Sequence, residues 1–180
     1  MNQVELVDKQ KSLKERIRRG GEGEDLVTDV EIIQLVTFLL DEVEYGVNIL
    51  SVHEILRIPE ITRLPNTPGF IKGVINLRGE VVPVIDLSSR FYGIEGVISE
   101  NTSIIIVEIA ENEEKIPIGV MIDSVRAVTE LSDESIESVP EIGNRIRLDY
   151  IDGIGKVDGE FAILLHIENV LKIEELSDFD

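Results

Sequence analysis

This 180-residue sequence repeats itself, and the repeat indicates how many structural units the chain forms. Residues 46–52 (GVNILSV) match residues 119–125 (GVMIDSV), 73 positions further along. Three shorter matches follow in the same order, at offsets of 75, 80 and 80 residues: Leu64-Pro65 with Val139-Pro140, Ile71–Val74 with Ile151–Ile154, and Gly79–Val81 with Gly159–Phe161. Chance similarity between two β-rich halves is the alternative. The preserved order favours two like units with different loop insertions, packed together with a groove between them.

The segments between turn signals are short and rich in branched residues, which is typical of strands. Strands are expected at residues 32–40, 45–49, 73–77, 80–87, 103–109, 115–122, 153–157 and 161–167. Pro83 cannot donate to a ladder, so its strand is expected at an edge or a bulge. Residues 51–57 are interpreted as a turn or helix, and residues 168–176 as a terminal helix with Ile167, Val170, Leu171 and Leu176 facing inward. Close strand spacing predicts small barrels or a sandwich.

Composition excludes several classes of protein. Hydrophobic residues make up 43% of the chain, enough for a sizeable core. The net charge of −19 disfavours general binding to nucleic acids or anionic membranes. The absence of cysteine excludes disulfides and thiol nucleophiles. No apolar run approaches the roughly 20 residues that span a bilayer, and the first residues lack the apolar core of a signal peptide, so a cytoplasmic protein is expected.

Charge is unevenly distributed along the chain. Residues 1–29 carry seven acidic and six basic residues and are predicted to be a mobile tail; the alternative is a short helix, with Leu6, Leu13 and Ile17 on one face, that orders on binding. Residues 57–90 hold five basic residues against three acidic ones: Arg57, Arg63, Lys72, Arg78 and Arg90 against Glu60, Glu80 and Asp86. This basic island is either a partner surface or a local fluctuation.

No catalytic or metal-binding constellation is apparent. The sequence contains two histidines, His53 and His166, and neither has a metal-ligand spacing partner. We interpret His166 as a core-edge histidine with a satisfied ring nitrogen. Asp86, at a strand end, is expected to accept hydrogen bonds from turn amides rather than to act as a general base. No cofactor is therefore predicted.

Recognition is the remaining possibility, and residues 66–79 are its strongest candidate. Gly73 permits a close backbone approach. Residues 76–79, Asn76-Leu77-Arg78-Gly79, are interpreted as a hairpin tip in which Gly79 takes a positive φ and Arg78 extends into solvent. A guanidinium there suits a carboxylate or carbonyl partner, although an ordinary solvated arginine is the alternative.

From about residue 32 to about residue 171, the sequence resembles the CheW family. The most similar stretches are residues 44–55, 62–79 and 84–87, with a second-unit motif at Asp123-Ser124-Val125. The resemblance implies an all-β fold of two small five-stranded barrels, Src-homology-3-like, packed about a shared hydrophobic core. It also implies a chemotaxis adaptor without catalysis, which couples the cytoplasmic tip of methyl-accepting chemoreceptors to the regulatory domain of a CheA-type histidine kinase. Other CheW-like barrels in arrays are a further candidate partner.

The family's binding positions correspond to Val52, Glu54, Gly73, Arg78 and Gly79. Val81 and Val82, and the hairpin residues Asn76 and Leu77, complete the predicted partner-binding set. The predicted domains are the tail (1–29), a CheW-like domain (30–175) and the terminal helix (168–176). The first barrel is expected at about residues 45–100, and the second at about 30–40 plus 101–167.

The sequence leaves three alternatives to a chemotaxis adaptor. A small hydrolase or isomerase would use Asp86 or His166 and would lose turnover when either is replaced. A single-strand nucleic-acid barrel would need basic grooves with exposed aromatics, whereas aromatic residues make up 4% of this acidic chain. A CheW-like module that serves a different kinase system is nearly indistinguishable by sequence.

Overall fold

The structure, a computed structural model, describes residues 30–140 and 146–172. Within these residues, ten strands form two five-stranded sheets, and the helices are short. The predicted all-β fold class is confirmed, while closure of each sheet into a barrel stays a prediction. The predicted tail (1–29) lies outside the described residues, as does the end of the predicted terminal helix (173–176).

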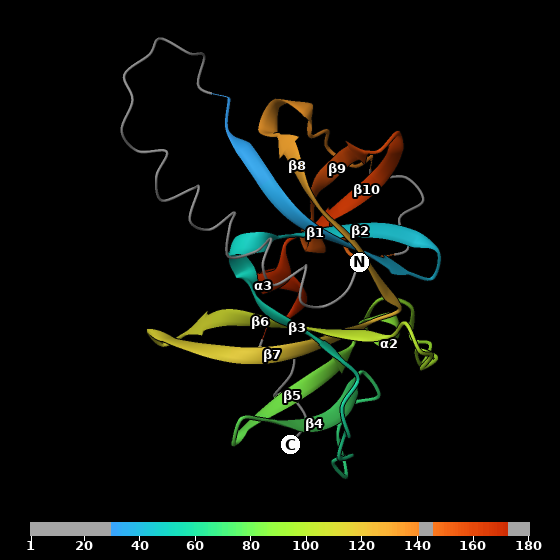
Figure 1. Cartoon of the computed structure of the whole chain (residues 1–180), viewed down its shortest axis with the longest axis vertical. Helices are drawn as coiled ribbons and strands as arrows, with labels where there is room; N and C mark the ends of the chain where they lie inside the picture. Colours follow the sequence, from blue (N-terminus) through green and yellow to red (C-terminus); the bar gives the residue numbers. More distant parts are fainter. Residues whose placement is uncertain (1–29, 141–145, 173–180) are drawn as a thin grey trace.

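The two sheets form two layers, sheet A in the upper part of Figure 1 and sheet B in the lower part. Sheet A contains, from edge to edge, β8 (Ser124–Ser132), β1 (Ile32–Leu40), β2 (Val43–Asn48), β10 (Glu160–Leu165) and β9 (Ile151–Val157). Sheet B contains β3 (Val52–Arg57), β6 (Ser103–Glu111), β7 (Glu114–Ile122), β5 (Glu80–Asp86) and β4 (Ile71–Leu77). The helical elements are α2 (Leu87–Tyr92), α3 (Ile167–Val170), and the 3₁₀ turns η1 (Ile49–Ser51), η2 (Asp133–Ser135) and η3 (Leu148–Tyr150).

Strand pairing divides the chain differently from the predicted barrel boundaries. The prediction placed the boundary between residues 40 and 45, inside a hairpin, and assigned residues 101–122 to the second barrel. In the structure β1 and β2 stay paired and lie together in sheet A, while β6 and β7 lie in sheet B. The β1–β2 hairpin is joined to β10 by parallel pairing of β2 with β10, and the β6–β7 hairpin is joined to β5 by parallel pairing of β7 with β5. Each sheet therefore combines a local hairpin with strands from the other half of the sequence.

The repeat is visible in details of the backbone. β3 and β8 each carry one extra residue in their ladders, His53 and Arg126, which are 73 positions apart. β4 and β9 each carry one extra residue, Lys72 and Asp152, which are 80 positions apart. These spacings equal the offsets of the sequence matches, so the two sheets are built on the same plan, bulges included.

The bulges also explain which strands the sequence pattern missed. Residues 51–57 were interpreted as a turn or helix and residues 124–132 were not identified as a strand, yet they form β3 and β8. In β3 the extra residue His53 breaks the alternation, so the buried residues Val52 and Ile55 lie three apart, a spacing typical of helices.

The expectation that Pro83 lies at an edge or bulge holds locally, although its strand is not an edge strand. Pro83 is in β5, an internal strand of sheet B between β7 and β4. The parallel pairing of β5 with β7 begins only at Val84. Pro83 therefore has no β7 residue opposite it, and its missing backbone N–H removes no hydrogen bond to β7. A proline is therefore accommodated inside the sheet.

A shared hydrophobic core holds the sheets together, as predicted. Its buried residues come from both sheets and from α3; they include Phe38 and Tyr45 of sheet A, Ile85 and Ile105 of sheet B, and Leu171 after α3. Each sheet also has a smaller cluster of its own. The predicted terminal helix is observed as α3 at Ile167–Val170, and Ile167, Val170 and Leu171 are buried as expected.

Candidate interaction surface

The β4–β5 hairpin presents Arg78 at its tip. Both central residues of its two-residue turn have positive φ, 51° at Arg78 and 87° at Gly79, and Leu77 pairs with Glu80 across them. The side chain of Asn76 accepts a hydrogen bond from the Gly79 backbone N–H at 2.8 Å. This is the geometry of a type I′ hairpin turn. The predicted positive φ of Gly79 is confirmed, and Arg78 shares it.

Arginine is unusual at this turn position. The equivalent first residues of three other hairpin turns are Asp41, Asn112 and Asp158, with φ between 48° and 49°. Asp and Asn tolerate the left-handed region because their short polar side chains can hydrogen-bond locally, whereas arginine gains nothing there. Turn preference therefore does not account for Arg78, which indicates a role for its side chain.

Arg78 pairs with Glu54, another predicted binding residue. Its Nη1 donates to Glu54 Oε2 at 3.3 Å, and Nη2 makes a second, closer bond to Oε1. The side chains are 67% and 19% exposed, respectively. Hydrogen bonding to Glu54, followed by its negative charge, raises the pKa of Arg78. Because β3 and β4 are the two edges of sheet B, the pair connects the hairpin tip to the opposite edge strand.

Several other predicted residues are buried. Val52 and Val82 are 1% and 0% exposed. Gly73 is buried at φ 148°, and a Cβ there would overlap the carbonyl oxygen of Thr62. Leu77 is partly buried and packs against the cluster inside sheet B. These residues support the shape of the hairpin and of β3 rather than forming an outer surface.

The outer face of the hairpin is formed by the remaining predicted residues: Asn76, Arg78, Gly79 and Val81. Val81 is 68% exposed, a high value for a large apolar residue in a strand. The repeat places Phe161 of β10 at the equivalent position, and it is 66% exposed. Phe161 is not in the predicted partner-binding set, although the sequence match of Gly79–Val81 with Gly159–Phe161 places it opposite Val81 in the repeat.

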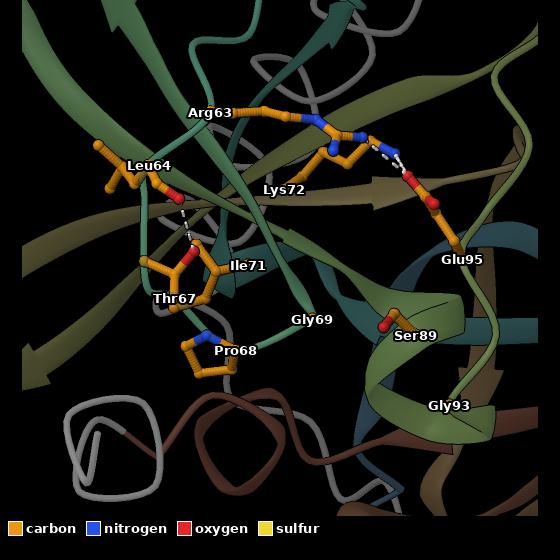
Figure 2. A pocket seen from close by; sticks show the side chains of 10 residues that line it. All are labelled: Arg63, Leu64, Thr67, Pro68, Gly69, Ile71, Lys72, Ser89, Gly93 and Glu95. Carbon is orange, nitrogen blue, oxygen red and sulfur yellow. Dashed lines mark hydrogen bonds and ion pairs between the residues drawn. The ribbon is translucent and has the colours of Figure 1, made fainter. Parts of the chain in front are cut away.

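Three of the five cations of the basic island, Arg63, Lys72 and Arg78, form ion pairs within the chain. Arg63 and Lys72 both bind Glu95 Oε1, at 3.2 and 2.6 Å, and Figure 2 shows the two cations converging on it. Arg90 lies over the ring of Phe70, 4.6 Å from its centroid. The hydrogen bond from Lys72, its charge and the charge of Arg63 hold the pKa of Glu95 below its ordinary value. The positive charges of this region therefore hold loops together.

Glu95 closes one side of a hollow of about 400 Å³. The walls come from the loop after β3, from β4 and from α2, and include Leu64, Pro68, Ile71 and Ser89. Figure 2 shows Thr67 on the same wall, where its hydroxyl donates to the Leu64 carbonyl oxygen at 3.1 Å. Sequence reasoning missed Glu95, because its two partners lie 23 and 32 residues away.

The candidates for chemistry have structural roles. Asp86 is 1% exposed and accepts hydrogen bonds from the backbone N–H groups of Ser89 at 3.2 Å and Gly96 at 2.8 Å, as expected. His166 is half-buried, and its Nδ1 lies 2.9 Å from Asp152 Oδ1, which satisfies that nitrogen as predicted. Among the described residues, no group of histidine and acidic side chains is arranged to hold a metal ion.

Comparisons with known proteins agree with this architecture. The family model described as "CheW-like domain" matches residues 34–175. "Chemotaxis protein CheW" of Klebsiella aerogenes is 37% identical over 147 residues, covering 82% of this chain and 86% of that protein. The protein of the same name from Treponema pallidum is 32% identical over 146 residues, covering 81% and 86%.

A solved structure shows the same fold. The "scaffolding protein TtCheW from Thermoanaerobacter tengcongensis" superposes with a TM-score of 0.69 at 35% sequence identity, covering 82% of this chain and 93% of that one. Helices in the described ranges are all too short or too polar to cross a membrane. Two matched five-stranded sheets, a family match over most of the chain and relatives above 30% identity lead to one conclusion: this chain belongs to the CheW-like domain family of chemotaxis scaffold proteins.

Proposed function

We propose that this chain is a non-catalytic cytoplasmic adaptor that couples methyl-accepting chemoreceptors to a CheA-type histidine kinase. Its relatives carry the name of a chemotaxis protein, and a structural neighbour is described as a scaffolding protein. The described residues that could carry chemistry, Asp86 and His166, are engaged in turn and loop contacts. The proposal therefore rests on surfaces rather than on a reaction.

The observation that carries the proposal is the arginine at the hairpin tip. Arg78 is exposed, occupies a turn position that suits Asp or Asn, and is oriented by Glu54. A partner carboxylate or carbonyl can approach the remaining face of its guanidinium, while Val81 offers an adjacent apolar contact. Val52, Gly73, Leu77 and Val82 act indirectly, by holding the strands that present this face.

Substitutions of Arg78 test the binding surface. Arg78→Ala should melt within a few degrees of wild type, because the residue is exposed and packs against no core. Binding to a receptor cytoplasmic fragment, to the kinase regulatory domain, or to both should weaken by about tenfold or more, as for interface arginines whose contacts are desolvated. Arg78→Glu should weaken binding further, because it places a carboxylate beside Glu54. Arg78→Lys should restore binding only in part if a two-pronged hydrogen bond is needed.

The measurements are calorimetry for folding, followed by titration against each partner at two salt concentrations. Arg126→Ala is the matched control, because Arg126 is an exposed bulge residue of sheet A, away from the hairpin. Wild-type binding of folded Arg78→Ala to both partners would contradict the hairpin surface. The adaptor function itself fails if receptor-dependent kinase autophosphorylation is the same with and without the wild-type protein.

A further inference from the structure

A second surface hollow lies where the β1–β2 and β7–β8 turns meet the loop after α2. It has a volume of about 350 Å³, and its walls include Tyr92, Ile94 and Val97 from α2 and the following loop, with Asp41 and Asp123 from the β1–β2 and β7–β8 turns. Ile94 is 67% exposed and Val97 is 82% exposed. We call it the loop hollow. Its exposed apolar side chains contribute little to the core of the described chain.

The charged groups around the loop hollow are acidic. Its lining contains Asp41, Glu95 and Asp123, and no lysine or arginine is among the described lining residues. Asp123 is held in place because its Oδ2 accepts the Asp41 backbone N–H at 2.8 Å, and Glu95 is shared with Lys72 and Arg63. An apolar floor bordered by carboxylates suits a basic amphipathic segment.

The chain contains such a segment outside the described residues. Residues 9–19 (KQKSLKERIRR) hold six basic residues and one acidic residue, net +5, whereas residues 30–180 carry −18. Leu13 and Ile17 are four apart and would share one face of a helix. This is the most strongly basic segment of the sequence. Its apolar residues Leu13 and Ile17 could contact the apolar floor of the loop hollow, and its basic residues could contact the surrounding carboxylates.

The connection is long enough for the segment to bind its own chain. β1 runs from Ile32 to Leu40, next to Asp41 at the hollow, a distance of about 27 Å at about 3.4 Å per residue. The twelve residues between Ile17 and Val30 extend to about 40 Å. A tether of this length gives an effective concentration of the order of millimolar, which favours binding in cis over binding to a second copy.

We propose that residues 9–19 dock in the loop hollow of the same chain, with Leu13 and Ile17 against Ile94 and Val97 and the basic side chains against Asp41 and Asp123. The docked segment covers the exposed apolar loop and neutralises part of the acidic surface around it. This inference is independent of the proposed adaptor function, because it rests on the hollow and on the charge of the segment.

Paramagnetic labelling of the full-length chain tests the docking. The chain has no cysteine, so a nitroxide attached to Ser12→Cys sits at one place only. Backbone amide signals of Asp41 and of residues 94–99 should lose intensity, whereas those of the β9–β10 hairpin should not. The loss should diminish at about 1 M salt, where the Debye length falls to about 3 Å.

Two variants of the labelled chain identify the contact. Val97→Asp should abolish the selective signal loss, because it places a carboxylate on the apolar floor. Phe161→Asp, a change at an equally exposed apolar residue of β10, should leave the signal loss intact. The double variant Leu13→Asp, Ile17→Asp should also abolish the selective signal loss, because it removes the apolar contacts that the segment makes.

Three outcomes would overturn the proposal. Signal loss that is absent at residues 94–99, or that spreads evenly over the chain, would show that the segment does not dock there. Signal loss that persists in Val97→Asp would place the contact elsewhere. In a further experiment, chain that carries the spin label but no ¹⁵N is mixed with ¹⁵N-enriched chain that carries no spin label. Signal loss in this mixture would show that a second copy of the chain occupies the hollow.

Discussion

Replacing Gly73 by alanine tests why a buried glycine belongs to the predicted binding set. A Cβ at position 73 would overlap the carbonyl oxygen of Thr62, at a φ of 148° that alanine rarely adopts. Thr62 is fixed by two backbone hydrogen bonds with Val74, at 2.9 and 2.8 Å. Holding alanine in this sparsely populated backbone region costs about 1–2 kcal/mol, at the lower end of the usual range, and disturbing both hydrogen bonds costs about 0.5–1.5 kcal/mol each. The expected loss of unfolding free energy is therefore about 2–5 kcal/mol.

This loss is a large part of the roughly 5–15 kcal/mol that stabilises a typical domain. At about 2–4 °C per kcal/mol for a chain of this size, the Tm should fall by about 4–20 °C. The overlap with Thr62 should also displace β4, which carries Gly73. Partner binding should therefore weaken indirectly, because Gly73 is buried beneath the hairpin and not on its outer face.

Substitutions at two other glycines distinguish the cost of backbone strain at positive φ from the cost of steric overlap of the new Cβ atom. Gly79 has φ 87° with no atom within 4 Å of its Cβ position, so Gly79→Ala should lose only about 1–2 kcal/mol. Gly153, the repeat equivalent of Gly73, lies outside the positive-φ region, but its Cβ would lie 2.8 Å from the Glu137 carbonyl oxygen. Gly153→Ala should therefore lose about 1–3 kcal/mol by disturbing the two backbone hydrogen bonds between Glu137 and Ile154.

The assay is thermal and urea unfolding followed by circular dichroism. Alanine also lowers the conformational entropy of the unfolded chain, which favours the folded state by about 0.4–1 kcal/mol. This effect acts alike at all three sites and leaves their order unchanged. Gly73→Ala must be the most destabilised of the three. Equal losses in Gly73→Ala and Gly79→Ala would show that the close approach to Thr62 is unimportant, and wild-type stability of Gly73→Ala would refute the reasoning altogether.

Two further predictions concern the Glu95 contacts and the shared core. Because Lys72 and Arg63 lower the pKa of Glu95, the carboxylate stays ionised below the ordinary pKa of a glutamate. The stability that its ion pairs contribute is fully present above the ordinary pKa and is lost as the pH falls through the lowered value. In a carboxyl ¹³C NMR titration, Lys72→Met should move the midpoint up towards the ordinary value, and an unchanged midpoint would exclude Lys72 as the main cause. A fragment of residues 1–100 lacks β6 to β10, which are three strands of sheet A and two of sheet B, so it should show no cooperative melt. A melt that matched the full chain would contradict the shared core.

Much of the fold could be predicted because it depends on neighbouring residues. β1, β5 and β7 appear as runs of branched residues between turn signals, and the hairpin at Arg78-Gly79 follows from local turn chemistry. The repeat carries the same information twice, so it indicated two similar units before any contact was known. Exposure of Arg78 and the turn-capping role of Asp86 follow from the same local logic.

Tertiary structure decided what depends on distant residues. The parallel pairs β2–β10 and β5–β7 bring together segments far apart in the sequence, and no local pattern specifies such pairings. The bond from Arg78 to Glu54 spans 24 residues, which turned an apparently free arginine into a paired one. The burial of Val82 beside the exposed Val81 depends on which face of β5 meets the core. Periodicity reports which residues share a face, but only packing determines which face is covered, because burial depends on the partner that the whole chain supplies.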